Sequence, residues 1–421
     1  MHREAEATYA EVAAELGLII DEAIAAQCGS GDTPWVLNAS PLPRAEVVDG
    51  VFVLLDPSYL GPMVPATPPA AGVRADERSL DNGLVRVDLD DDGLISAITD
   101  LAADRAVLAL GQRGNLLRLH TDLPNEWDAW DVDRHYRHQY VDLTAVESIT
   151  LVESGPLVGA IRVVRAFGNS RIVQTIRIQA GSRRIDVQTE IDWHETEKIL
   201  KATFPLDVHA DRTAAEIQFG HVFRPTHTNT SWEAARFEVY CHRWVHASEH
   251  GYGVALINDA TYGHDVTREG GVTTVRLSLL RAPRCPDPHA DQGTHRMTYA
   301  IVPGATIADA IAEGYALNLP LRIRPGGSAD AVRSLVDVEG ATLEAVKLAD
   351  DRSGDVILRV YESLGGRARA RLRASFPLAG VEVVDLLERP LPDVRPAPEV
   401  DGWLPLDLHP FQVLTLRLRR S

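Results

Sequence analysis

The sequence predicts a mainly β protein of several consecutive domains: an N-terminal helix, a small β domain, a large antiparallel β body and a C-terminal β-sandwich. Three observations support this prediction. A chain of 421 residues is longer than one hydrophobic core usually organises. Apolar residues make up 45% of it and charged residues 24%, which is typical of a folded protein. From about Ser79 onward, short apolar runs recur between Gly, Pro, Asn and Asp, as expected of strands joined by turns.

Residues 1–27 are expected to form one amphipathic helix. Apolar side chains recur at three- and four-residue steps, among them Val12, Leu16 and Ile19. A lone helix has nothing to cover such a stripe, so we expect it to dock on another domain or to belong to a helical bundle. The segment has acidic residues early and no long apolar run, unlike a secretory signal.

Residues 28–75 are expected to form a small β domain and a linker. The runs WVLNAS and GVFVLL have the composition of strands, and proline and a turn around Asp49 and Gly50 separate them. The following segment, PSYLGPMVPATPPAAG, is rich in proline, which lacks the N–H that a strand ladder needs. We therefore interpret it as a connector.

Residues 76–320 are predicted to form one large antiparallel body of two stacked sheets. The segment LVRVDLDDDGLISAITD contains a strand, a DDG turn and a second strand, which predicts a hairpin. Further strands are expected in AIRVVRAF, RIVQTIRIQ, RRIDVQTEIDW, TFPLDV, RFEVYCHRWVHA, YGVALIN, TTVRLSLL and HRMTYAIVPG. The segment TIADAIAEGYALN is expected to be a short helix.

Residues 330–421 are predicted to form a C-terminal β-sandwich of immunoglobulin-like size. Short strands are expected at close spacing in SLVDVEG, LEAVKLAD, VILRVYES, ARARLRASFP, VEVVDLLE and FQVLTLRLR.

Charge and cysteine content exclude several classes of function. The formal net charge is −18, and so acidic a surface repels nucleic-acid phosphates and anionic lipids. No stretch approaches the ~20 apolar residues of a membrane span, and we expect a cytoplasmic protein. Cys28, Cys241 and Cys285 form no CxxC pair, so neither a structural zinc site nor a disulfide framework is indicated. We expect all three to be small buried residues.

The densest group of candidate site residues is Asn125 to Asp133, where Trp127 and Trp130 alternate with Asp128 and Asp131. Indole rings stack on the apolar face of a pyranose and carboxylates accept its hydroxyl hydrogens, so this segment is a candidate sugar contact. The two aspartates could also supply the carboxylate pair of glycoside hydrolysis. The alternative is a structural loop whose tryptophans pack on the sheet while its acids cap backbone amides.

Three further polar clusters are candidate contacts. They contain His227 and Asn229, His242 and Arg243, and Asp291 and His295. His and Asp can bind metals, but no HxH or HExxH spacing supports a closed site, and we predict none. Each histidine on its own is interpreted as an ordinary hydrogen-bonded residue. No GxSxG nucleophile elbow is present, which argues against a serine hydrolase.

Three long blocks of the sequence resemble the glycoside hydrolases of family 38, closest to the cytosolic and bacterial type of α-mannosidase. They are DLPNEWDAWDVDRHY, IQFGHVFRPTHTNTSWEAARFEVYCHRWVHASEHGYGVALIND and LSLLRAPRCPDPHADQGTHRMTYAIVPG. The resemblance extends from the N-terminal helix to PFQVLTLRL, which covers nearly the whole chain. It implies that residues 76–320 form a β super-sandwich similar to galactose mutarotase.

The resemblance also implies what this chain lacks. In the family, a zinc-bearing N-terminal domain carries the metal ligands and the Asp nucleophile of a retaining mechanism, and nothing here matches that domain. We therefore expect no complete catalytic centre and no metal in this chain, with Zn²⁺ belonging to the full-length enzyme. The expected partners are an α-mannoside and the missing catalytic domain. The residues expected to reach the sugar site are Trp127, Asp128, Trp130, Asp131, His227, Asn229, His242, Arg243, Asp291 and His295.

Several interpretations stay open at this point. The chain could be a truncated α-mannosidase, the product of a split gene, or a subunit that joins a separate catalytic chain. The helical stripe also allows self-association into a homo-oligomer. A free-standing carbohydrate-binding protein is a second interpretation. A mutarotase or epimerase, with His227 as acid and Asp128 as base, is a third that rests on likeness of fold alone.

Overall fold

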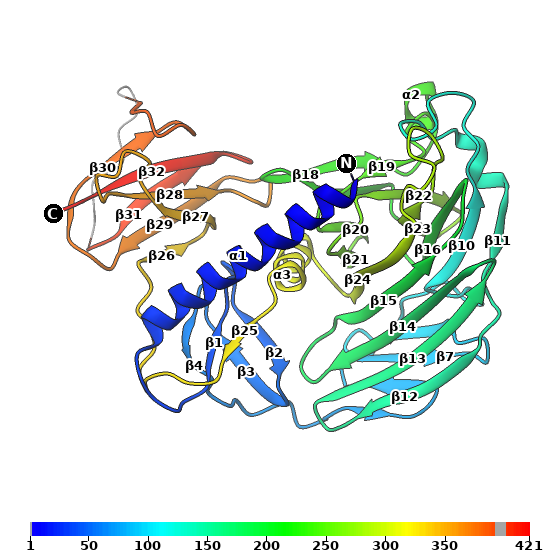
Figure 1. The fold of residues 1–421 in the computed structure, drawn as a ribbon, viewed down its shortest axis with the longest axis horizontal. Coiled ribbons are helices and arrows are strands. Elements are labelled where there is room, and N and C mark those ends of the chain that lie inside the picture. Colours follow the sequence, from blue (N-terminus) through cyan, green and yellow to red (C-terminus); the bar gives the residue numbers. More distant parts are fainter. Residues whose placement is uncertain (1, 392–400) are drawn as a thin grey trace.

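Two large antiparallel sheets form the centre of the molecule in the computed structural model, which describes residues 2–391 and 401–421 (Figure 1). The nine-stranded sheet has, in spatial order, β12 (Ser148–Ser154), β13 (Val158–Phe167), β14 (Ser170–Gln179), β15 (Ile185–Trp193), β24 (Gly293–Pro303), β21 (Tyr252–Asn258), β20 (Trp244–Glu249), β17 (Arg212–Ile217) and β18 (Gly220–Pro225). The six-stranded sheet has β11 (Tyr140–Asp142), β10 (Leu116–Thr121), β16 (Lys198–Leu206), β23 (Val272–Arg281), β22 (Gly263–Glu269) and β19 (Val239–Tyr240).

A five-stranded sheet completes the large body. It contains β5 (Arg74–Ala75), β6 (Ser79–Asp81), β7 (Val85–Leu89), β8 (Ile95–Asp100) and β9 (Arg105–Ala106). The predicted DDG turn joins β7 to β8, with Gly93 at φ 67°, a backbone angle that glycine adopts at no steric cost. A Cβ at this position would lie 2.8 Å from Val163 Cγ1, so the turn also packs closely on β13.

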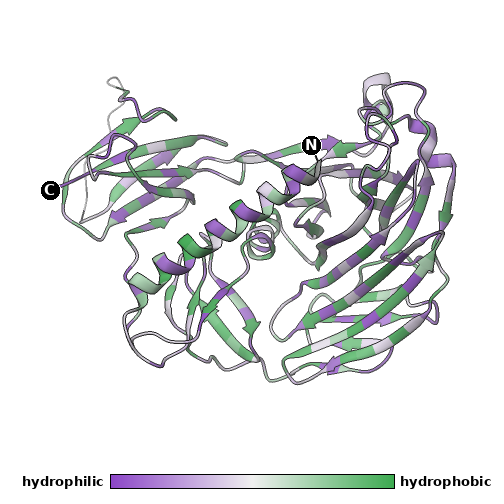
Figure 2. Ribbon diagram, viewed as in Figure 1, coloured by the Kyte–Doolittle hydropathy of each residue, from purple (hydrophilic) through white to green (hydrophobic). Residues whose placement is uncertain are grey.

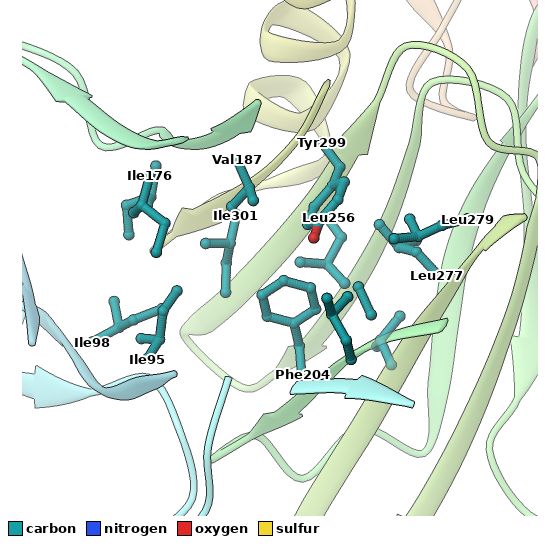
Figure 3. Close-up of a cluster of buried hydrophobic side chains, with 14 of the residues drawn as sticks. Ile95, Ile98, Ile176, Val187, Phe204, Leu256, Leu277, Leu279, Tyr299 and Ile301 are labelled. Atoms are coloured by element: carbon teal, nitrogen blue, oxygen red, sulfur yellow. The ribbon is translucent and has the colours of Figure 1, made fainter. Parts of the chain in front are cut away.

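One continuous hydrophobic core joins these three sheets. Ile98 comes from the five-stranded sheet, Phe204 and Leu277 from the six-stranded sheet, and Val187 and Ile301 from the nine-stranded sheet, and all five side chains are buried (Figure 3). In each strand every second side chain points to this inner face. Apolar runs with a period of two residues therefore predicted the large β body.

The N-terminal part consists of α1 (His2–Cys28) and two small sheets. The hairpin has β2 (Arg44–Val48) and β3 (Val51–Leu55), and the three-stranded sheet has β1 (Trp35–Leu37), β4 (Leu60–Pro62) and β25 (Arg322–Arg324). The expected proline-rich connector is thus wrong in one respect, because β4 lies within it. Proline at Pro62 is tolerated there since β4 is an edge strand.

Helix α1 projects along the front of the molecule, and hydrophobic and hydrophilic residues alternate along it (Figures 1 and 2). Tyr9, Leu16, Leu18 and Ile19 are between 53% and 74% exposed, so these apolar side chains are largely uncovered in this chain. Within the described residues, no helix combines the length and the hydrophobicity needed to cross a bilayer.

The C-terminal sandwich pairs two sheets around its own core. One sheet has β26 (Val336–Glu339), β29 (Ala368–Ala374) and β31 (Leu404–Leu408), and the other has β27 (Thr342–Leu348), β28 (Val356–Tyr361), β32 (Val413–Arg420) and β30 (Leu378–Val384). Leu358, Leu372 and Leu416 are buried between them. Helix α3 (Ile307–Asn318), predicted from TIADAIAEGYALN, precedes the sandwich and packs on β20 and β21. The mainly β fold with a C-terminal sandwich is confirmed.

Two further expectations from the sequence are wrong. RFEVYCHRWVHA is not one strand, because β19 joins the six-stranded sheet and β20 the nine-stranded sheet, with Cys241 to Arg243 crossing between them. Cys28 and Cys241 are buried as expected, and burial raises the pKa of Cys241 to about 12, but Cys285 is exposed. Cys285 lies in a loop after Arg281, beyond the end of the strand that would have buried it.

Candidate functional site

Trp127 and Trp130 lie in the loop between β10 and the 3₁₀ helix η1 (Arg134–His138). Trp127 has φ 59°, and its carbonyl accepts the N–H groups of Trp130 at 2.7 Å and Asp131 at 2.8 Å, which closes a tight turn. The two indoles are 68% and 71% exposed. They are therefore not buried against the sheet, and both rings are open to contact from solvent.

The two aspartates of this loop bind backbone N–H groups. Asp128 Oδ2 accepts the N–H groups of Arg284 and Cys285, both at 2.7 Å, and Asp131 Oδ1 accepts that of Val132 at 2.9 Å. Asp128 thereby fastens this loop to the segment after β23. The alternative of a purely structural loop is therefore right for the two aspartates, which bind backbone N–H groups, and wrong for the two tryptophans, which are exposed.

His227 and Asn229 lie in a second loop, which leads into the one-turn helix α2 (Ser231–Ala234). Thr230 and Glu233 form a capping box that orders this loop, and the ring Nδ1 of His227 lies 3.3 Å from Glu233 Oε2. Asn229 is exposed, and Trp232 beside it is 64% exposed. A mutarotase would need His227 and Asp128 to face one sugar ring as acid and base. In this structure His227 faces Glu233, and Asp128 binds backbone N–H groups.

Asp291 and His295 flank the start of β24. Asp291 has φ 58°, and its carbonyl lies 2.7 Å from His295 Nε2. The side chain of the intervening Gln292 donates to the Glu195 carbonyl at 2.7 Å. These contacts hold the loop against the end of β15.

A buried ionic network lies below the first two loops. Lys201 Nζ lies 2.6 Å from Asp265 Oδ2 and 2.5 Å from Glu238 Oε2, and the Lys201 and Asp265 side chains are at most 1% exposed. Tyr136 donates its O–H to Glu238 at 2.9 Å, and Arg276 donates to Asp265 at 2.8 Å. Burial opposes the charge on Lys201, but the two carboxylates outweigh it and raise its pKa.

This network connects the first two loops to the six-stranded sheet. Tyr136 follows the tryptophan loop and Glu238 follows the His227 loop, while Lys201, Asp265 and Arg276 belong to the six-stranded sheet. Together with the bonds of Asp128, it gathers the first two loops and the segment after β23 at one end of the large body, at the upper right of Figure 1. Sequence reasoning missed it, although a lysine inside the apolar strand KILKATFPL was a usable signal.

His242 and Arg243 line a different feature, a cavity of about 320 Å³ where the large body meets the C-terminal sandwich. Arg243 donates to both oxygens of Glu216, and its guanidinium lies 3.8 Å from the centre of the Tyr315 ring. Burial disfavours this charge, but Glu216 outweighs it and raises the Arg243 pKa. The His242 ring lies edge-on to Tyr262 at 5.7 Å. Asn318, Glu344 and Tyr361 complete the wall of the cavity.

The described part of the chain does not fit a zinc ion. Among residues 2–391 and 401–421, no three His, Cys, Asp or Glu side chains come together as a metal site. Asp128, Asp131 and His295 contact backbone groups instead, and we assign no step of any reaction to a metal held here.

Comparison with known families decides the identity of the chain. Residues 80–289 match the family 38 glycosyl hydrolase C-terminal domain, and residues 340–416 match the family 38 C-terminal β-sandwich domain. The chain belongs to glycosyl hydrolase family 38. Both matched segments are C-terminal domains of that family, in agreement with the resemblance found in the sequence.

Relatives of this family 38 chain are longer than it is. It is 36% identical to human Alpha-mannosidase 2C1 over 99% of its own length but spans 43% of that protein. It is 31% identical to the Alpha-mannosidase of Saccharomyces cerevisiae, covering 77% of this chain and 33% of the relative. An α-mannosidase structure from Enterococcus faecalis shares the fold at 16% identity, with a TM-score of 0.67 over 93% of this chain and 51% of the other.

Proposed function

We propose that this chain is the C-terminal β region of an α-mannosidase, which supplies scaffold and sugar-contacting residues to an active centre completed by other polypeptide. The observation that carries this proposal is the similarity to α-mannosidases along nearly the whole chain, which spans less than half of their length. The hydrolysis of terminal α-mannose residues, the dependence on Zn²⁺ and a cytoplasmic location belong to the same proposal.

Exposed apolar side chains support the proposal that another domain docks on this chain. The uncovered side chains of α1 and the indoles of Trp127, Trp130 and Trp232 leave large rings and aliphatic groups in solvent. A docked domain would remove such side chains from water, which is favourable. A catalytic domain seated on α1 and the loop end of the large body would cover them.

The ten expected contact residues act in two groups under this proposal. The loop group contains Trp127, Asp128, Trp130, Asp131, His227, Asn229, Asp291 and His295, and the cavity group contains His242 and Arg243. In the loop group the exposed tryptophans offer the stacking surface, while Asp128 positions the loop. In the cavity group Glu216 and Tyr315 hold the Arg243 guanidinium rigidly, which favours a role in fixed recognition of a ligand or of a neighbouring domain.

Activity measurements test the proposal. The purified chain, with and without added Zn²⁺, is expected to leave a nitrophenyl α-mannoside uncleaved, because no three His, Cys, Asp or Glu side chains of the described residues come together to hold the metal. Co-expression with the N-terminal part of a related α-mannosidase is expected to restore zinc-dependent cleavage, and Arg243→Ala in the added chain to lower it at least tenfold. Zinc-dependent turnover by this chain alone would contradict the proposal.

A free-standing carbohydrate-binding protein is the second candidate, favoured by the exposure of Trp127 and Trp130. Micromolar binding of mannobiose by this chain, unaffected by a co-expressed catalytic part, would favour it over the first proposal. Calorimetric titration gives this comparison directly.

A further inference from the structure

Arg281, the last residue of β23, holds the tryptophan loop from inside the protein. Its Nε donates to the carboxylate of Asp122 at 2.6 Å. Its Nη1 donates to the Ala129 carbonyl at 3.1 Å, and its Nη2 donates to the carbonyls of Asp128, at 2.7 Å, and Asp131. One side chain thus binds both the start of the loop and its turn.

These contacts fix the backbone of the turn. Three carbonyl oxygens within residues 128–131 accept hydrogen bonds from one guanidinium, that of Arg281. The side chains of Trp127 and Trp130 are mostly exposed. The turn is therefore held in place, with both rings largely in solvent, before any ligand arrives.

Arginine suits this position better than lysine. A guanidinium presents five N–H donors in a planar fork, whereas an ammonium is a compact charge with three donors. The Asp122 side chain is 1% exposed, so its charge depends on the Arg281 partner. Burial raises the pKa of Asp122, and the hydrogen bond from Arg281 opposes that rise.

We infer that Arg281, together with Asp122, is the positioning pair that presents Trp127 and Trp130 as a preformed stacking platform for the apolar face of a pyranose. This inference rests on the proposed function, because it assumes that the loop contacts sugar. Two indoles held rigidly lose little freedom on binding, so a platform of this kind gains affinity from preorganisation.

The test measures loop order and sugar binding on the same full-length variants. Arg281→Lys and Asp122→Asn are expected to speed amide hydrogen exchange of residues 123–133 at least tenfold and to weaken binding of methyl α-mannoside, followed by tryptophan fluorescence, at least tenfold. Trp130→Ala is expected to lose binding while exchange in the loop stays slow. Arg284→Lys is the matched control, since Arg284 is 61% exposed and its side chain lies 3.7 Å from Glu197 rather than on the loop.

The outcomes separate the two proposals. If the unaltered chain binds the mannoside and Arg281→Lys and Asp122→Asn keep both slow exchange and affinity, the positioning role is overturned while sugar contact stands. If the unaltered chain binds no mannoside, either alone or co-expressed with the N-terminal part of a related α-mannosidase, sugar contact by this chain fails, and the platform role fails with it. Faster exchange together with weaker binding in both variants, but not in Arg284→Lys, supports the inference.

Discussion

The six-stranded sheet contains several buried titratable side chains. Beside the Lys201 network lie two histidines, His120 on β10 and His264 on β22, which are 3% and 0% exposed. Burial lowers the pKa of His120 to about 4 and that of His264 to about 3, with Arg224 lowering the latter further. Both are neutral in the folded protein at neutral pH.

These histidines are expected to make the protein sensitive to mild acid. In the unfolded chain they take up protons below about pH 6.5, whereas in the folded chain they stay neutral until far lower pH, so stability falls as pH falls. Between pH 7 and pH 5 the loss is about 2 kcal/mol for each histidine. Urea unfolding at both pH values checks this, and His264→Leu is expected to remove part of the difference. A free energy of unfolding equal at both pH values would contradict it.

Helix α1 is the element whose packing differs most from the rest. Residues 4–16 are almost all exposed, and only the last part, with Ile24 and Cys28, approaches the small sheet. A helical stretch as short as residues 4–16 is marginal in water without packing, because most helical stability in proteins comes from packing.

Hydrogen exchange in the purified chain is therefore expected to divide α1 in two. Amides of residues 5–16 should exchange at least a hundredfold faster than those of β14 and β15, which lie inside the nine-stranded sheet. Slow exchange along the whole helix at high protein concentration, lost on dilution, would instead show that α1 pairs with a second copy.

At the scale of the whole molecule, the large body and the C-terminal sandwich each have a hydrophobic core of their own, and aromatic side chains meet between them. The Phe219 ring lies edge-on to Tyr361 at 5.7 Å, and the Tyr315 hydroxyl lies 3.1 Å from that of Tyr361. His221 and Phe411 make a similar edge contact at 5.0 Å. Because neither of these two cores extends across this junction, we expect these rings to contribute much of the coupling between the sandwich and the large body.

Phe219→Ala is expected to loosen that coupling without damage to either core. Calorimetry should show the unfolding transition of the sandwich moving several degrees below that of the large body, since multidomain chains unfold in separable steps when their interface weakens. Leu348→Ala, at a side chain 63% exposed on the sandwich surface, is the control and should leave the profile unchanged. A single unaltered transition in Phe219→Ala would contradict the expectation.

The sequence predicted the sheets better than the site. Alternation in RIVQTIRIQ and the DDG turn are local signals, and both appear in the structure as β14 and the β7–β8 turn. The positions of Arg243 in a junction cavity and of Arg281 under the tryptophan loop depend on strand pairing between distant segments. Such register is not encoded within any short window, and neither is the crossing of Cys241 to Arg243 from one sheet to the other.

The small sheet has a consequence for biosynthesis. Trp35 on β1 pairs with Arg324 on β25, and its indole N–H donates to the Ser328 carbonyl at 2.7 Å. On the ribosome β1 can pair with β4 soon after both emerge, but β25 follows all the strands of the large body, so the sheet stays incomplete throughout their translation. The addition of β25 then fastens this early segment to the far end of the large body.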